Sequence, residues 1–411
     1  MSPEAQYKYL LGLKSIRDGA RVVYESAQKG ELTNFEFHAH KLDGVAEFVA
    51  SLIMQSFAPE LFTLIPPHGR WQHFEVKQVP RVDSILKEWR AAGVEELECS
   101  RRLVDLFLVS VLLDAGAGDV WRYKEESTGL SLERSEGIAV ASLYAFTDGL
   151  FCSEGIGLML THTDSNGAEI THNRETQQGY AIILGESPPW SPSTSRAVTE
   201  TERLAIIASR QSVDKTIDVN ILWDSLQQLL IPTWPAGRTV FHGQPLGDAW
   251  PLQLLSDGSG IQPFHKLTQW LTYSLTVIFE RVLGIEWTNK EDLTGLPEYR
   301  NGGLYVDMGV LTLKPDVLAR GLEASTTGLP QFDATDDVIV EWRAMTVALL
   351  DTTLGLVNEK LAAQTEGAAA ALSLPQLLEA GTWKAGRELA ARHRPATKSS
   401  PILILSDGTL F

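Results

Sequence analysis

The sequence contains little cysteine and no long apolar run. Only Cys99 and Cys152 occur among its 411 residues, which argues against a disulfide scaffold or a cysteine-based zinc site and is typical of a reducing compartment. The longest apolar run, 106–113, is far shorter than the ~20 residues of a membrane helix. The first 20 residues lack the continuous apolar segment of a signal peptide. We therefore expect a cytoplasmic protein without a membrane partner.

Basic residues are also in short supply. The chain has 35 Lys and Arg against 52 Asp and Glu, a formal net charge of −17. Because nucleic-acid binding depends on clustered Lys and Arg, this balance argues against a nucleic-acid partner. A small anionic ligand remains compatible with it, since a few basic side chains suffice to bind a phosphate.

The apolar content is sufficient for a large core. Hydrophobic residues make up 44% of the chain and charged residues 21%, which is ordinary for a globular protein. We expect one large, mostly α-helical domain over 1–411 with a minor β component. The segment 184–203 is rich in Pro, Ser and Thr and predicts a surface loop or an internal boundary.

Helical periodicity covers much of the chain. We expect helices over 7–30 (ending at Gly30), 35–57, 84–94, 95–116 (ending at Gly116) and 336–362. Two short segments read as extended structure: WQHFEV at 71–76 and the beginning of the tail at 401–411.

The clearest periodic segment is FHKLTQWLTYSLTVIFERVL, 264–283, which carries two distinct faces. One face is apolar and consists of Leu267, Leu271, Leu275, Ile278 and Val282. The other face consists of Lys266, Gln269, Trp270 and Tyr273. This second face is either the solvent side of a surface helix or a ligand-facing stripe.

Several common catalytic motifs are missing. A Gly-x-Gly at Gly116 and Gly118 has Trp121 where a dinucleotide-binding turn needs a small residue, so a helix end is favoured. His38 and His40 would point about 200° apart on a helix, which suits metal chelation badly. HExxH, P-loop and Gly-x-Ser-x-Gly patterns do not occur. We expect neither a metal nor an organic cofactor.

The segment RSEGIAVASLYAF, 134–146, predicts a helix start. Ser135 is the expected N-cap and Glu136 lies in the expected first turn. A helix N-terminus beside Arg134 would also suit a phosphate group, so both interpretations stay open.

The stretch LTGLPEYRNGGLYVDMGVL, 293–311, brings together two acids, a phenol and a guanidinium. Glu298 and Asp307 flank Tyr299-Arg300 and a Gly302-Gly303 pair that predicts a turn. Arg300 could simply neutralise one of the acids. Alternatively, a carboxylate could stabilise positive charge at a sugar's anomeric carbon or activate a water. Glu341 and Arg343 predict a structural ion pair or a buried charge network.

Six long motifs carry a resemblance to a known family. They are HFEV at 73–76, LLDAGAGDVWRYKE, RSEGIAVAS, FHKLTQWLTYSL, LTGLPEYRNGGLYVDMGVL and ILSDGTLF. Together they resemble the uracil-catabolism protein 4 family, long described as a domain of unknown function. The resemblance implies a role in opening the pyrimidine ring of a uracil nucleotide and eventually releasing urea. The step it favours is N-glycosidic hydrolysis of a ribosylurea phosphate.

A weaker resemblance points in the same direction. The block 266–311, followed by VEWRAMTV, is similar in order and spacing to the queuosine-salvage N-glycosidases, and this implies a helical DNA-glycosylase-like core. Those enzymes carry Asp-Tyr-Arg where this chain has Glu298-Tyr299-Arg300. The change leaves the role of Glu298 open, and the resemblance does not place Asp307.

The resulting hypothesis is a hydrolase acting on a phosphorylated riboside. Glu298 or Asp307 would be catalytic, Tyr299 and Arg300 would position the sugar or the carboxylates, and Lys266 or Arg134 would bind the phosphate. The remaining candidate substrate-binding residues are Gln269, Trp270, Tyr273, Glu136, Asp114 and His73, the last two at the urea end. Two alternatives remain: an amidohydrolase acting on a urea-derived fragment, and a non-catalytic partner of a pathway enzyme.

Overall fold

A computed structural model describes residues 2–114, 121–150, 215–234, 237–255, 259–367 and 370–405. The chain forms two compact units, each assembled from separate stretches of sequence. The first unit comprises Met1–His68, Pro235–Gln269 and Glu291–Phe411, and the second comprises Gly69–Trp234 and Trp270–Lys290. The sequence-based expectation of one domain over 1–411 stays a prediction, and the segment 184–203 lies outside the described residues.

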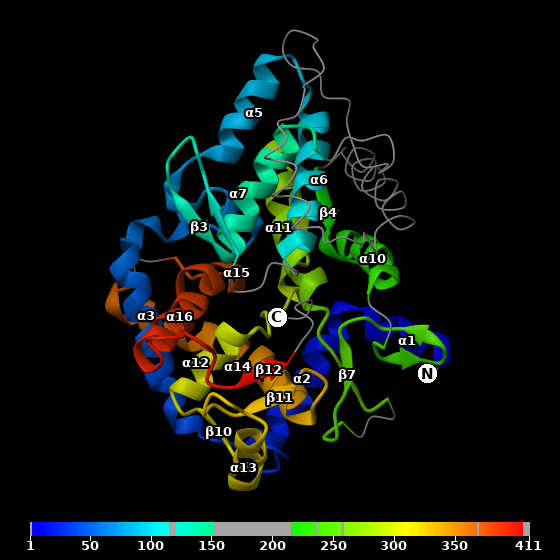
Figure 1. The fold of residues 1–411 in the computed structure, drawn as a ribbon, viewed down its shortest axis with the longest axis vertical. Helices are drawn as coiled ribbons and strands as arrows, with labels where there is room; N and C mark the ends of the chain where they lie inside the picture. Colours follow the sequence, from blue (N-terminus) through cyan, green and yellow to red (C-terminus); the bar gives the residue numbers. More distant parts are fainter. Residues whose placement is uncertain are drawn as a thin grey trace. The chain divides into compact units, whose positions relative to one another are not determined.

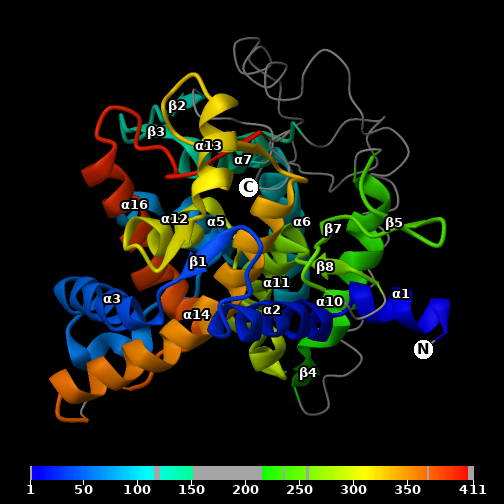
Figure 2. The ribbon, with the colours of Figure 1, turned by 90° about the horizontal axis from the view of Figure 1, so that it is seen from below.

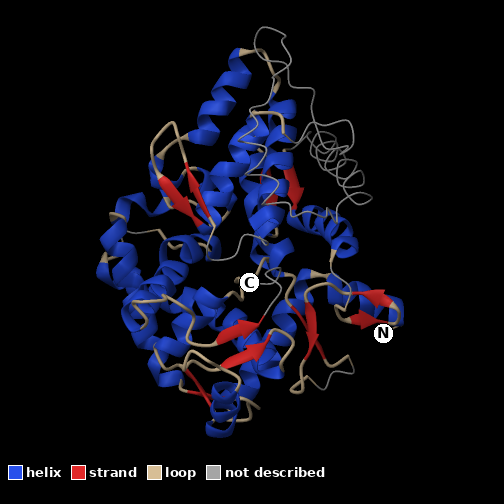
Figure 3. Ribbon diagram, in the orientation of Figure 1, coloured by secondary structure: helices blue, strands red, loops and turns tan. Residues whose placement is uncertain are grey.

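Helices dominate the described residues of both units, as expected (Figure 3). The α- and π-helices of the first unit are α1 (Pro3–Leu11), α2 (Leu13–Gln28), α3 (Leu42–Ser56), α12 (Tyr299–Asp307), α13 (Pro315–Glu323), α14 (Asp337–Gln364), α15 (Leu374–Leu377), η7 (Leu378–Thr382) and α16 (Trp383–His393). Those of the second are α4 (Arg70–Phe74), α5 (Arg81–Ala91), α6 (Glu96–Asp114), α7 (Arg134–Thr147), α10 (Val219–Leu230) and η5 (Phe279–Leu283). Helix α11 (Lys266–Ile278) begins in the first unit and continues in the second.

Short 3₁₀ segments connect several of these helices: η1 (Ala39–Lys41), η2 (Pro59–Leu64), η3 (Val76–Gln78), η4 (Ile231–Thr233) and η6 (Lys290–Asp292). Among the described residues none of the helices is long and apolar enough to span a bilayer.

The β component is minor and consists of two-stranded pairs. The first unit holds the antiparallel pairs β1 (Phe35–Phe37) with β10 (Leu311–Leu313), β5 (Val240–Phe241) with β6 (Gln244–Pro245) and β7 (Ala249–Pro251) with β8 (Ile261–Pro263), and the parallel pair β11 (Gln331–Asp333) with β12 (Leu403–Leu405). The second holds antiparallel β2 (Arg122–Lys124) with β3 (Ser131–Glu133) and parallel β4 (Thr216–Asp218) with β9 (Glu286–Thr288).

Helix α14 organises the first unit. It packs against α2 and α3, and all three are visible together in Figure 2. Ile16 and Val23 of α2 and Val45 and Val49 of α3 are fully buried. The 3.6-residue spacing of such apolar side chains is what directs these helices to one another. In the second unit α6 and α7 pack side by side, as Figure 1 shows.

Four local expectations were wrong. The segment 35–37 is strand β1 rather than helix, because it pairs with β10 some 270 residues later, at 311–313. The segment WQHFEV, 71–76, was expected to be extended, but residues 71–74 belong to helix α4, which ends at Phe74. Helix α7 begins at Arg134 with Glu133 at the N-cap, so Ser135 lies inside it, although Glu136 is in the first turn as expected. The Gly302-Gly303 pair lies within helix α12 rather than in a turn.

Packing explains why α12 continues through its two glycines. A Cβ at Gly302 would lie 2.9 Å from the Trp342 ring of α14, and one at Gly303 would lie 3.1 Å from Pro401. On α16, a Cβ at Gly386 would lie 2.0 Å from the Arg300 carbonyl oxygen. Glycine therefore permits close helix contact here, which outweighs its cost of about 1 kcal/mol within a helix.

His38 and His40, the histidine pair considered as metal ligands, lie in the first unit. His38 forms a hydrogen bond of 2.9 Å between its Nε2 and the Thr312 hydroxyl, and its ring centroid lies 6.1 Å from that of His40. Among the described residues no group of three His, Cys, Asp or Glu is arranged to hold a metal ion.

Candidate functional site

Glu298 is the N-cap of helix α12 and is buried, with 8% of its surface exposed. Its Oε1 accepts a hydrogen bond of 2.6 Å from the Asn301 amide and its Oε2 one of 2.8 Å from the Arg300 amide. Both carboxylate oxygens are therefore fixed by the first turn of the helix. This geometry leaves the carboxylate with one defined orientation.

Burial of Glu298 favours proton uptake by its carboxylate. Burial raises the pKa of its carboxyl group above the ordinary value, although the two backbone hydrogen bonds and the charges of Lys266 and Arg300 act in the opposite direction. A carboxyl group with a raised pKa beside a cation is a typical acid–base or charge-stabilising residue.

The backbone of Lys266 is fixed by the buried ion pair between Asp248 and Arg343. Lys266 is the first residue of α11, and its backbone N–H donates to Asp248 over 2.9 Å. Asp248 binds the Arg343 guanidinium with both oxygens at 2.8 Å and accepts a further hydrogen bond from the Trp250 indole. The Arg343 charge and these hydrogen bonds hold the pKa of Asp248 well below its usual range, against the opposing effect of burial.

The buried charge network expected around Arg343 therefore has Asp248 as its acid. Sequence reasoning missed Asp248, because GDAW at 247–250 matches no catalytic motif and its partner lies almost 100 residues away. Glu341 serves another purpose: it accepts backbone hydrogen bonds from Thr33, Asn34 and Phe35.

Gln269 and Asn301 fasten the segment before Glu298. The Gln269 side-chain oxygen accepts from the Thr294 amide at 3.1 Å, and the Asn301 side-chain nitrogen donates to the Leu296 carbonyl at 3.1 Å. Both side chains are fully buried. Together they hold the backbone at 294–296, which leads directly into the N-cap.

Tyr299 and Arg300 form a stacked pair. The Arg300 guanidinium lies 4.7 Å from the Tyr299 ring centroid and donates to the Lys398 carbonyl over 2.9 Å. The contact of Arg300 with Glu298 is made by its backbone amide. The expectation that these two side chains position a sugar stays a prediction.

Asp307 lies at the opposite end of α12 from Glu298. The two acids are nine positions apart, or about 13 Å along a helix at 1.5 Å per residue. Both Asp307 oxygens are bound by the Arg394 guanidinium, at 2.8 and 2.5 Å. The two acids that adjoin in the sequence are therefore separate in space, because the glycines extend the helix instead of reversing the chain.

A second polar cluster surrounds Arg70, a residue that the sequence analysis did not select. Arg70 is fully buried at the start of α4, and its guanidinium donates to the Ser110 hydroxyl and carbonyl and to Asp114 over 2.8–2.9 Å. Its backbone amide donates to the Ser274 hydroxyl at 2.9 Å. Gly69 permits this approach, since a Cβ there would lie 3.2 Å from the Ser274 backbone.

The Arg70 cluster gathers four residues that the sequence analysis selected. Asp114 is the ion-pair partner, and His73 Nδ1 lies 3.3 Å from an Arg70 nitrogen. Because a guanidinium has no acceptor, His73 Nδ1 must accept this hydrogen bond. The centroid of the Trp270 ring lies 5.5 Å from the Arg70 guanidinium carbon and 5.6 Å from the centroid of the His73 ring. The negative charge of Glu136 favours the charged form of Arg70, against the effect of burial, which lowers the pKa of Arg70.

The other two candidates of the second unit are placed differently. Arg134 has a φ of 53°, in the left-handed region, because strand β3 runs directly into helix α7. Tyr273 is 3% exposed and Gln269 is fully buried, so the polar stripe of α11 is not the solvent side of a surface helix. Whether the stripe binds a ligand stays a prediction.

Comparison with known proteins identifies relatives over the whole chain. The family described as "Protein of unknown function (DUF1688)" matches residues 9–180 and 183–411. Protein urg3 of Schizosaccharomyces pombe is 44% identical over 423 residues, and Uracil catabolism protein 4 of Lachancea kluyveri is 39% identical over 448 residues. Each alignment covers 100% of both chains. These matches confirm the resemblance found in the sequence, and the chain belongs to the DUF1688 family of which Uracil catabolism protein 4 is a named relative.

Proposed function

We propose that this protein is an N-glycosidase of uracil catabolism that hydrolyses a phosphorylated ribosylurea-like substrate to urea and a sugar phosphate. The observation that carries the proposal is Glu298, a buried carboxylate fixed by two backbone amides within electrostatic reach of Lys266. The full-length similarity to a protein named for uracil catabolism supports the choice of pathway.

The chemistry requires a negative charge near the anomeric carbon. As the C1′–N bond breaks, positive charge develops on the sugar, and a fixed carboxylate stabilises it or removes a proton from the attacking water. Water supplies the oxygen of the new C1′–O bond, and its protons end on the sugar hydroxyl and the urea nitrogen. In our proposal Glu298 has this role and Lys266 attracts the phosphate.

The proposal assigns Asp307 a structural role, because both of its oxygens are bound by Arg394. It also retains the prediction of a DNA-glycosylase-like helical core, which is supported by the mostly helical architecture and by a carboxylate at a helix N-terminus.

A coupled assay tests the proposal. Purified protein is incubated with ribosylurea 5-phosphate, and urea and reducing sugar are measured together. We expect equal release of both products and a loss of about 10²–10⁴-fold in Glu298→Gln. The matched control is Glu341→Gln, a second buried glutamate that accepts backbone hydrogen bonds in the same unit.

The control variant should retain kcat, provided that circular dichroism confirms its fold. No release of urea by the folded wild-type protein would refute this substrate. Full activity in Glu298→Gln would refute the assignment of the residue.

A further inference from the structure

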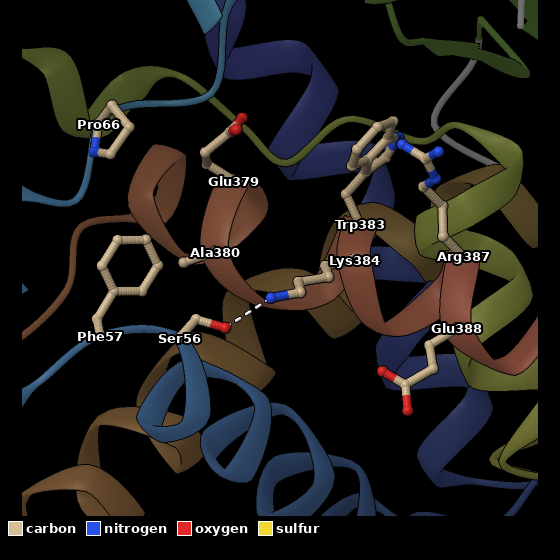
Figure 4. A pocket seen from close by; sticks show the side chains of 9 residues that line it. All are labelled: Ser56, Phe57, Pro66, Glu379, Ala380, Trp383, Lys384, Arg387 and Glu388. Carbon is tan, nitrogen blue, oxygen red and sulfur yellow. Dashed lines mark hydrogen bonds between the residues drawn. The ribbon is translucent and has the colours of Figure 1, made fainter. Parts of the chain in front are cut away.

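A pocket of about 560 Å³ opens beside helix α16 in the first unit (Figure 4). It is of the size that binds small molecules. Its walls come from the end of α3, the loop before His68, the π-helical turn η7 and helix α16. The lining residues are Ser56, Phe57, Pro66, Glu379, Ala380, Trp383, Lys384, Arg387 and Glu388. Glu298 is not among them.

The pocket combines apolar walls with cationic side chains. Phe57, Pro66 and the Trp383 ring supply flat apolar surface. The Arg387 guanidinium lies 4.7 Å from the Trp383 ring centroid. Aromatic rings beside basic groups recognise planar molecules that carry an acidic group, because the ring stacks while the cation binds the anion.

The charges of the pocket residues favour an anion. Glu388 is paired with Arg392, and Glu379 forms a 2.6 Å hydrogen bond with the His68 ring. The Lys384 ammonium donates to the neutral Ser56 hydroxyl over 2.6 Å and forms no ion pair with any described residue. Glu388 thus has a cationic partner and Glu379 is bound by the His68 ring, whereas the Lys384 charge has no acidic partner among the residues that the structure describes.

The wall of the pocket contains an irregular helical turn. Residues Leu378–Thr382 form the π-helical segment η7, which contributes Glu379 and Ala380 to the lining. The Thr382 hydroxyl is completely buried and has no hydrogen-bond partner among the described residues. Single π turns are costly and occur frequently at functional sites. Here the π turn places Glu379 and Ala380 in the wall of the pocket.

We propose that this pocket is a second binding site, for a small organic anion composed of a planar ring and a phosphate or carboxylate group. Lys384 and Arg387 would bind the acidic group, and Trp383 and Phe57 would enclose the ring. Helix α16 also packs on α12, where Gly386 meets the Arg300 backbone. Glu298 does not line the pocket, and the inference does not depend on the proposed activity.

Isothermal titration calorimetry tests this site with the full-length protein. The probes are uridine 5′-monophosphate, which joins a ring to a phosphate, and orotate, which joins a ring to a carboxylate. Uridine and inorganic phosphate each supply one half of the recognition chemistry. We expect saturable 1:1 binding of at least one of the two ring acids, and binding at least about tenfold weaker for uridine and phosphate.

Variants assign the binding to the pocket. Lys384→Glu and Trp383→Leu should each weaken it by at least about tenfold, whereas Lys384→Arg should retain it. Lys8→Gln, at an exposed lysine of α1, is the matched control. Glu298→Gln should bind normally, which separates this result from the test of the proposed activity. Absence of binding by both ring acids, or equal binding in wild type and Lys384→Glu, would overturn the proposal.

Discussion

Glu298 and Asp307 show how position determines the chemistry of a carboxylate. Glu298 is buried, which raises the pKa of its carboxyl group, although two backbone amides and the charges of Lys266 and Arg300 oppose this shift. Asp307 is bound at both oxygens by one guanidinium. The first arrangement suits proton transfer, whereas the second suits structural support.

The raised pKa of Glu298 predicts a pH profile for the proposed activity. If the ionised carboxylate acts, kcat/KM should fall as the pH drops through the raised pKa, on a limb above the ordinary glutamate value of about 4.3. Measuring kcat/KM from pH 4 to 9 checks this. The limb should be missing from the residual activity of Glu298→Gln. An unchanged limb in that variant would assign it to another group.

Glu125 provides a stability prediction in the second unit. The Arg81 guanidinium, which binds both of its oxygens, lowers the pKa of Glu125 to about 2. Because the folded state holds the proton less tightly, this pair stabilises the fold above the unfolded pKa, and its contribution is lost as the pH falls toward 2.

Glu125→Gln should therefore lower the free energy of unfolding at pH 7 by about 3–5 kcal/mol, since it leaves Arg81 buried without a counter-charge. Urea denaturation at several pH values measures this difference, which should shrink between about pH 4.5 and 2. A difference independent of pH would contradict the prediction. Glu96→Gln, at an exposed pair with Arg90, is the matched control.

Several residues of the candidate site were selected from the sequence, but their connections were not visible there. Glu298 stands out as an acid in an apolar segment, and Lys266 as part of the second face of 264–283. Asp248 and Arg70 do not, because their significance comes from partners that are distant in the chain. Asp114 and His73 were selected from family motifs, and only the fold brings them to the same guanidinium.

At the scale of elements, the glycines of α12 and α16 are packing surfaces. Gly386 faces the Arg300 carbonyl so closely that a methyl group would displace the backbone. By contrast, a Cβ added at Gly355 of α14 would have no neighbouring atom within 4 Å. The two sites therefore separate the effect of helix contact from that of helix propensity.

Substituting alanine at these positions should have opposite effects. Gly386→Ala should lower the free energy of unfolding by about 1–3 kcal/mol through overpacking. Gly355→Ala should raise it by about 0.5–1 kcal/mol, because alanine is the better helix former. Thermal and urea unfolding measure both. Equal effects of the two substitutions would show that the close contact with Arg300 is not maintained in solution.

Elements with strong local periodicity were predictable, whereas those defined by a distant partner were not. Helix α14 appears where its apolar pattern places it. Strand β1 does not, since a three-residue strand carries little local signal and depends on β10 for its hydrogen bonds. The prediction of a turn at Gly302-Gly303 was wrong for the same reason, because the glycines pack against Trp342 and Pro401, which lie far along the chain.

At the scale of the whole molecule, the proposed chemistry uses protein side chains alone. We therefore expect the hydrolysis of ribosylurea 5-phosphate to survive dialysis against a metal chelator, because in our proposal Glu298 stabilises the developing charge or removes the water proton and Lys266 attracts the phosphate. The coupled assay before and after dialysis measures this. A loss of activity that zinc or manganese restores would favour the amidohydrolase alternative, whose chemistry usually needs a metal.

The interleaved composition of the two units has a consequence for synthesis on the ribosome. Helices α2 and α3 pack on α14, yet the whole of Gly69–Trp234 is translated after α3 and before α14. At about 5–20 residues per second, roughly 300 residues take 15–60 s to synthesise. Throughout that interval the apolar faces of the first 68 residues lack their partner helix. We therefore expect the nascent N-terminal segment to depend on chaperones until the C-terminal third of the chain, which contains α14, has been synthesised.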